Sequence, residues 1–171
     1  RFIKSNNKFI RFNTHWYYLY VCYLMQLINI PVNKLDEVWS LVKNNIQQAL
    51  SFSGNQTDAE FVYETIKNKK FQLWIVWDED KKTVKEQYNG VVVTEIIQRK
   101  LKRSCNIFIV TGKNRQQWQH LISVLEDFAL KNDCNNMELI SRNGWEKIMN
   151  KFDYKKTHVV LEKTLTKKEK Q

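Results

Sequence analysis

The sequence predicts a mixed α/β domain in which a sheet of about six strands is flanked by about four helices. Three observations lead to this prediction. Apolar residues recur at helical spacing in two long segments, apolar runs of strand length lie between those segments, and short polar turns join three of the runs. With 171 residues, 43% hydrophobic and 13% aromatic, the chain can build one domain with a real core.

The first part of the domain reads as a strand followed by two helices. Residues 26–30 alternate apolar and polar side chains, which is typical of a strand, and Asn33 can cap the helix that follows. Thr57 and Glu60 form the S/T-x-x-E pattern of a capping box, which predicts a second helix. The expected inner faces are Leu35, Val38, Trp39, Val42, Ile46, Ala49 and Leu50 in the first helix, and Phe61, Val62 and Ile66 in the second.

Three strands are expected next, at residues 71–77, 91–97 and 105–110. The first is a nearly continuous apolar run, so both of its faces should be covered. Charged or basic turns at 78–82 and 98–103 join the three strands. Short turns of this kind favour an antiparallel meander.

The pattern changes between residues 106 and 165. A long helix over 115–131 is predicted by Trp118, Leu121, Ile122, Leu125, Phe128 and Ala129. A strand at 137–140, a short helix at 145–150 and a last strand at 157–165 complete the order. The strand–helix–strand crossover requires parallel pairing of the flanking strands.

The loop that opens the long helix, residues 111–118, is a natural cradle for an anion. Free N–H groups and the positive end of the helix dipole both point toward such a loop. This arrangement predicts a cofactor that carries phosphate.

The two ends of the chain differ from the part between them. Residues 1–24 contain four basic residues and no acid, and end in an aromatic run, 15–24, that is shorter than the roughly 20 residues a membrane span needs. The chain does not begin with Met, whereas Met25 opens a segment that resembles an ordinary domain start. We therefore expect 1–24 to be an upstream extension, 25–165 to be a single domain, and 166–171 to be a basic tail.

Charge and cysteine content narrow the classes of partner. The net charge of +10 favours anionic partners, but a solvated lysine-rich surface explains it better than a nucleic-acid footprint does. Nucleic-acid binding ranks last because no motif for it is present. Cys22, Cys105 and Cys134 are odd in number and widely spaced, which indicates a reducing, cytoplasmic setting. The cysteines and histidines show no metal-ligand spacing, so we expect no metal. No membrane association is expected, and the sequence leaves monomer and homodimer open.

The order of elements over 25–165 resembles the GNAT superfamily of N-acetyltransferases. Residues 89–93, Asn-Gly-Val-Val-Val, look like the start of that family's third strand. Residues 129–134, Ala-Leu-Lys-Asn-Asp-Cys, are similar to its A-x-x-x-G-C helix exit, and 152–155, Phe-Asp-Tyr-Lys, to its closing turn. Asn143-Gly144-Trp145, with Tyr154 eleven residues beyond Asn143, further resembles small bacteriophage proteins of this superfamily.

The resemblance implies that acetyl-CoA is the cofactor and an amine, whose identity the sequence does not reveal, the acceptor. In the family, pantetheine pairs with the exposed fourth strand, and the loop after it holds the diphosphate. Lys113 stands at the loop's basic position, and Arg115 could add charge. Three residues replace the usual glycines, and a tryptophan among them could block close phosphate contact. The replacements are Asn114, Gln116 and Trp118, and the expected cofactor-binding residues are Ile109, Val110, Thr111, Gly112, Lys113, Asn114, Arg115, Gln116, Gln117, Trp118 and Asn143.

The same resemblance suggests catalytic residues and leaves alternatives open. Glu95 is the one acid in a strand core there and is the candidate base, although it could simply lie at the wet end of its strand. The position of the family's tyrosine acid is Met149, and Asn143 could be a helix N-cap rather than a cofactor ligand. A GNAT-fold protein that has lost catalysis and serves as a binding module is therefore the alternative to an enzyme.

Overall fold

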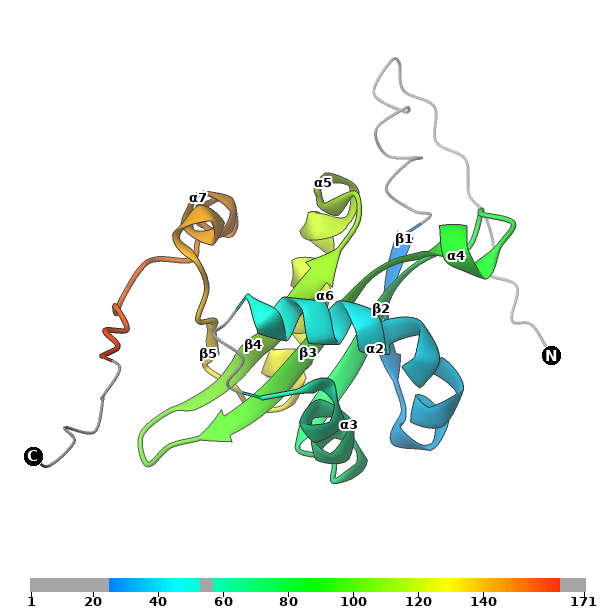
Figure 1. The fold of residues 1–171 in the computed structure, drawn as a ribbon. Coiled ribbons are helices and arrows are strands. Elements are labelled where there is room, and N and C mark those ends of the chain that lie inside the picture. Colours follow the sequence, from blue (N-terminus) through cyan, green and yellow to red (C-terminus); the bar gives the residue numbers. More distant parts are fainter. Residues whose placement is uncertain (1–24, 53–56, 164–171) are drawn as a thin grey trace, which may run out of the picture. The chain divides into compact units, whose positions relative to one another are not determined.

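The structure is a computed structural model that describes residues 25–52 and 57–163 (Figure 1). The described residues fall into two compact units, one ending at Leu139 and the other beginning at Ile140. The expected extension at 1–24 and tail at 166–171 lie outside the described residues. Within the described part, no helix combines the length and the apolar character needed to cross a membrane.

The first unit is built on one five-stranded sheet whose strand order follows the chain, β1-β2-β3-β4-β5. Pairing is antiparallel from β1 to β4 and parallel between β4 and β5, which confirms both the predicted meander and the predicted crossover. The mixed α/β class is confirmed, with one strand fewer in the described sheet than expected. The strands are β1 (Met25–Ile30), β2 (Phe71–Asp78), β3 (Tyr88–Gln98), β4 (Arg103–Gly112) and β5 (Asn136–Glu138).

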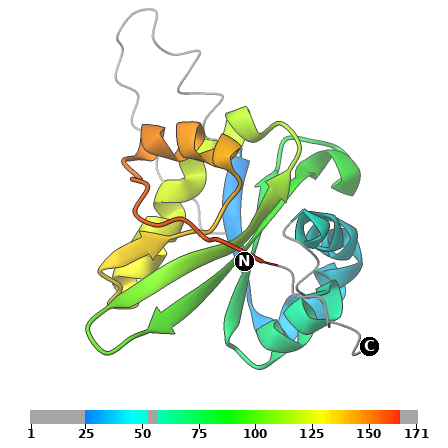
Figure 2. The same ribbon diagram turned by 60° about the vertical axis from the view of Figure 1, so that its left-hand side comes forward.

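One face of the sheet is covered by α2 (Leu35–Ser51) and α3 (Ala59–Lys67), as Figures 1 and 2 show. Both helices form because their apolar residues share one side, and these residues pack against β2, β3 and β4. Members of this core that are at most 1% exposed are Leu35, Val42, Ile46, Ala59, Val62, Ile66, Leu73, Val91 and Val93.

The predicted helix starts were wrong in detail. Asn33 lies within a 3₁₀ turn, η1 (Val32–Lys34), so it precedes the α-helix and does not cap it. α3 begins at Ala59, one residue later than a Thr57 cap requires, and the Asp58 side chain instead accepts from the Phe61 amide at 2.8 Å. Phe61 was also misassigned to the inner face, since it is 52% exposed.

The other face of the sheet packs against α6 (Ile122–Lys131). The rings of Trp74 and Phe128 meet edge to face at 5.0 Å, and Cys105 is buried with Ala129 and Cys134. The predicted helix over 115–131 is divided into α5 (Arg115–Trp118), the 3₁₀ turn η2 (Gln119–Leu121) and α6. It departs from helical geometry at Trp118, whose φ is −127° and whose side chain is buried.

A short helix that was not predicted, α4 (Val84–Gln87), stands between β2 and β3. Thr83 and Glu86 form a complete capping box there, with the Thr83 hydroxyl accepting from the Glu86 amide. The same S/T-x-x-E pattern that was sought at Thr57 is present in the sequence at Thr83, so the signal was available.

The second unit contains η3 (Asn143–Trp145), α7 (Glu146–Met149) and η4 (Asn150–Phe152), which confirms the short helix expected near 145–150. The last predicted strand, 157–165, was wrong over its described part, 157–163, where the structure has no strand. Val159, Val160 and Leu161 have strand-forming side chains but are 68–91% exposed. An extended segment becomes a strand only when it has a pairing partner, which propensity alone cannot supply.

Candidate functional site

β4 pairs with β5 over a short stretch, which leaves an open strand edge. Residues 104–106 of β4 pair with 136–138 of β5, and beyond Asn106 the described sheet gives residues 107–112 no strand partner on that side. Six extended residues present about 20 Å of backbone N–H and C=O groups. An edge of this kind can hold another extended group through backbone hydrogen bonds.

A β-bulge lies where this edge begins. Val93 of β3 faces Ile109 of β4, but the next residue, Thr94, faces Ile107, so Phe108 is an extra residue in β4. Bulges bend a strand and increase its twist, and they are common near functional sites. The extra residue, Phe108, lies two positions beyond Asn106, the last β4 residue that pairs with β5.

At the far end of the edge, β4 enters the loop through a close contact between two glycines. Gly112 has φ +156° and pairs with Gly90 of β3. A Cβ on Gly112 would lie 2.3 Å from the Asn89 carbonyl oxygen and 2.6 Å from the Gly90 Cα. The loop can begin here because neither position carries a side chain.

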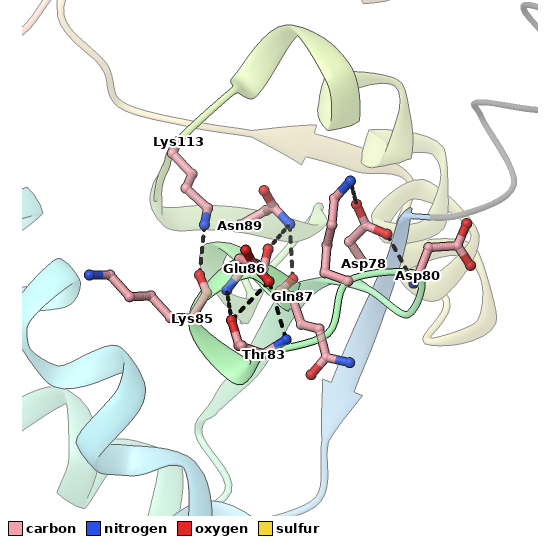
Figure 3. A network of polar contacts seen from close by, with 9 residues as sticks. Asp78, Asp80, Thr83, Lys85, Glu86, Gln87, Asn89 and Lys113 are labelled. Carbon is pink, nitrogen blue, oxygen red and sulfur yellow. Dashed lines mark hydrogen bonds and ion pairs between the residues drawn. The ribbon is translucent and has the colours of Figure 1, made fainter.

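The loop is held against α4 by Asn89 and Lys113 (Figure 3). The Lys113 amide donates to the Asn89 carbonyl at 2.8 Å, and the Lys113 ammonium donates to the Lys85 carbonyl at 2.7 Å. Asn89 is 3% exposed, and its side-chain amide donates to the carbonyls of Gln87 at 2.9 Å and Glu86 at 3.4 Å. An ammonium has three donors, so this contact leaves Lys113 capacity for an anion.

Trp118 lies beneath the loop rather than on its outer side. Its side chain is 5% exposed, and its indole N–H donates to the Lys113 carbonyl at 2.8 Å. A Cβ built on Gly90 would lie 3.1 Å from the indole ring. The bulky residue, where the resemblance implies glycine, therefore fills the interior and supports the loop through this hydrogen bond.

Asn114 adopts the backbone conformation that a glycine would otherwise supply. Its φ and ψ are 50° and 35°, in the left-handed region, where asparagine is among the best-tolerated residues after glycine. In the short helical turn that follows, the Gln117 amide donates to the Asn114 carbonyl at 2.9 Å. Lys113 and the half-buried Arg115 place two basic side chains at this loop. The other predicted cofactor residues of this unit are buried (Ile109), half-buried (Val110, Thr111) or exposed (Gln116, Gln117).

Glu95 lies at the opposite end of the open edge from the loop. It is half-buried, and its Oε1 accepts from the Asn106 side-chain amide at 2.8 Å. Glu95 and Asn106 are register partners, and Asn106 is the last residue of β4 that pairs with β5. Five strand positions separate Glu95 from Gly90, which is about 17 Å. The loop residue Lys113 and the candidate base Glu95 therefore lie near opposite ends of one edge.

Three residues of this region were not singled out from the sequence. Asn106 interrupts an apolar strand, and Phe71 and Phe108 lie on the Glu95 face of the sheet, with ring centroids 4.8 Å apart. An asparagine within a strand core was a readable signal. The bulge that brings Phe108 toward Phe71 has no sequence signature.

The second unit carries the other predicted positions. Asn143 begins η3, and its role as a cofactor ligand stays a prediction. Met149 is 6% exposed, and its thioether has no proton to donate. Tyr154 is half-buried, in the turn after η4.

A shallow groove elsewhere in the first unit lacks comparable chemistry. Its volume is about 580 Å³, and its lining is largely apolar, with Glu37 as the charged member. Glu37 is already paired with Lys34 at 2.6 Å. No cluster of three or more potential metal ligands occurs among the residues that the structure describes. The β4 edge, with the loop at one end and Glu95 at the other, is therefore the candidate functional site.

No protein-family model and no curated protein sequence matches the chain. Solved structures do match: a probable acetyltransferase, at 13% identity and TM-score 0.61, covers 85% of this chain and 99% of its own. An aminoglycoside acetyltransferase from an uncultured soil metagenomic sample, in complex with sisomicin, matches at 11% identity and TM-score 0.58 over 85% of this chain and 99% of its own. Glucosamine-6-phosphate N-acetyltransferase from Arabidopsis thaliana matches at 11% identity and TM-score 0.58, over 83% and 99%.

These structural neighbours are acetyltransferases, and at such identities their likeness concerns the fold. The chain therefore has the GNAT acetyltransferase fold, as the order of its elements predicted.

Proposed function

We propose that the protein is an N-acetyltransferase that transfers the acetyl group of acetyl-CoA to an amine. The observation that carries the proposal is the open edge of β4 at residues 107–112, which leads directly into the loop at 111–118. The acetyltransferase fold of the structural neighbours supports the same reading. The buried free thiols of Cys105 and Cys134 support a reducing, cytoplasmic setting.

The residues of the edge and loop would bind the cofactor by two kinds of contact. The backbone groups of 107–112 would pair with the amides of the pantetheine arm, as a further strand would. The side chains of Lys113 and Arg115 would hold the diphosphate through charge-assisted hydrogen bonds. Trp118 and Asn89 would keep the loop in place from the protein side.

When bound, acetyl-CoA supplies an activated thioester, so that a carbon–nitrogen bond forms as the carbon–sulfur bond breaks. The amine must lose a proton, and the departing sulfur must gain one. Glu95 would accept the amine proton, directly or through water, because it is the carboxylate at the bulge end of the edge. Asn106 would hold that carboxylate in place through its 2.8 Å hydrogen bond.

The second candidate is a GNAT-fold protein without catalysis, which serves as a binding module. Met149 favours it, because the resemblance implies a tyrosine proton donor where this chain has a buried thioether. This candidate predicts a folded protein that releases no thiol from acetyl-CoA with any amine. The two candidates therefore differ in a single measurement of thiol release.

Calorimetric titration of the full chain with CoA and acetyl-CoA tests the proposal directly. Lys113→Glu should weaken binding by about ten- to a hundredfold, because it removes a charge-assisted hydrogen bond. Lys100→Glu, a matched change of an exposed lysine in the β3–β4 turn, should leave binding unchanged. The absence of heat at millimolar ligand, or equal losses in the two variants, would contradict the proposal.

A further inference from the structure

Three phenylalanines form a continuous set of ring contacts beside Glu95, and we call Phe61, Phe71 and Phe108 the aromatic wall. Phe71 is the direct register partner of Glu95 across β2 and β3, so the two side chains share one face of the sheet. The Phe71 centroid lies 4.8 Å from that of Phe108 and 6.3 Å from that of Phe61. Phe71 is buried, whereas Phe61 is 52% exposed, so the wall reaches from the core to solvent.

The carboxylate of Glu95 has remaining hydrogen-bonding capacity. Asn106 donates to one of its oxygens, and among residues 25–52 and 57–163 no side chain forms an ion pair with it. Two cations of the β3–β4 hairpin, Arg99 and Lys102, pair with Glu138 instead. Glu95 is thus a half-buried carboxylate without an ion pair in the described part of a chain whose net charge is +10.

A carboxylate next to aromatic faces suits one class of ligand in particular. An ammonium is attracted both by the negative charge and by the π-faces of aromatic rings. The carbon skeleton attached to that ammonium would be in contact with apolar surface. A ligand that carries phosphate or another anion would instead be repelled by Glu95.

We infer that the amine acceptor is a small organic cation with an apolar or aromatic skeleton, bound with its ammonium on Glu95 and its skeleton on the aromatic wall. This inference rests on the proposed function, since it identifies the acceptor of that reaction. Its position agrees with such a role, because Glu95 pairs with Asn106, where the open edge of β4 begins. Glu95 and the parts of Phe61 and Phe108 that reach solvent are the contact groups.

Three small probes separate the charge from the skeleton. We would titrate the full chain, without CoA, with 2-phenylethylamine, with 2-phenylethanol, which has the ring but no charge, and with ethylamine, which has the charge but no ring. The amine with the ring should bind most tightly of the three. Equal affinity for 2-phenylethylamine and 2-phenylethanol, or no binding of any probe, would overturn the inference.

Variants locate the binding on the named groups. Glu95→Gln should weaken the binding of 2-phenylethylamine about ten- to a hundredfold and leave the affinity for 2-phenylethanol unchanged. Phe61→Leu, which keeps an apolar side chain but removes the π-face, should weaken the amine more than the alcohol. Glu64→Gln, an exposed acid on α3, is the matched control and should have no effect, and melting curves would show that each variant is folded.

The outcome is separable from that of the cofactor test. If CoA binds but the amine does not depend on Glu95, this inference fails and the proposed function stands. If the amine binds as described but CoA does not bind at millimolar concentration, the acetyltransferase proposal fails and the cation site stands.

Discussion

Replacement of Gly112 by alanine should destabilise the protein strongly, because the new Cβ would clash with the backbone of the neighbouring strand. It would lie 2.3 Å from the Asn89 carbonyl oxygen and 2.6 Å from the Gly90 Cα, and both are backbone atoms of β3. The clash can therefore be relieved only if β3 and β4 move apart at their paired ends. The φ of +156° adds strain for any residue with a side chain.

The size of the effect follows from these two terms. Overpacking costs about 1–3 kcal/mol and backbone strain about 1–3 kcal/mol, while the loss of glycine entropy in the unfolded chain returns about 0.4–1 kcal/mol. We expect a net loss of about 3 kcal/mol, which in a chain of this size lowers Tm by about 6–12 °C. Gly90→Ala should cost less, because its Cβ would lie 2.9 Å from the Thr111 oxygen and 3.1 Å from a Trp118 ring atom.

Urea and thermal unfolding, followed by circular dichroism, would measure the series. Gly144→Ala is the matched control, since a Cβ there meets nothing within 4 Å, and it should change stability by less than about 0.5 kcal/mol. The expected order of destabilisation is Gly112, then Gly90, then Gly144. If Gly112→Ala stayed within about 0.5 kcal/mol of the parent protein, the close approach of β3 and β4 at this point would be refuted.

Three further results are expected. Thr94→Val should lower the free energy of unfolding, measured in urea, by about 1–3 kcal/mol. The buried Trp74 indole N–H, which lies 2.9 Å from the Thr94 hydroxyl, would lose its acceptor. An unchanged urea midpoint would contradict that hydrogen bond. Burial raises the pKa of Tyr88 from 10.0 to about 12. The contribution of Tyr88 to stability is therefore complete below pH 10 and is lost as the pH rises toward 12. Tyr88→Phe should flatten this alkaline decline in the free energy of unfolding, and an identical pH profile in the variant would refute the burial. Burial, with a smaller effect from Cys134, raises the pKa of Cys105 from 9.0 to about 12, so at pH 8 its thiolate should be about a thousandfold scarcer than in the unfolded chain. Peptide mapping after iodoacetamide treatment should then find Cys105 unmodified in the native protein and modified in urea.

The sequence predicted the elements whose pattern is long or strongly apolar. α2 has a full apolar face over seventeen residues, and β2 is an apolar run of strand length, so each pattern predicts one kind of secondary structure. α4 was missed because four residues carry no periodicity, although its capping box was present at Thr83. The segment 157–163 shows the limit of propensity, since whether it forms a strand depends on pairing with distant residues.

The geometry of the candidate site could not be read from the sequence. Lys113 and Glu95 were chosen from what the family resemblance implies, and the structure puts them at opposite ends of one edge. From the sequence alone, Asn114 and Trp118 were expected to hinder close phosphate contact, because the resemblance implies glycine at both positions. In three dimensions Asn114 takes the left-handed conformation and Trp118 turns inward, and neither choice could be read without the backbone angles.

The strand order has a consequence for how the protein folds and opens. β2, β3 and β4 pair in the order in which they occur in the chain, and only residues 79–87 and 99–102 join them, so these two pairings close locally and should form early. β5 is joined to β4 through α5, η2 and α6 and is held by three residue pairs. It should therefore dock last and exchange its amide hydrogens soonest. The junction beside the proposed acceptor site would then open without unfolding of the antiparallel sheet, so the region would be free to move while the scaffold stays fixed.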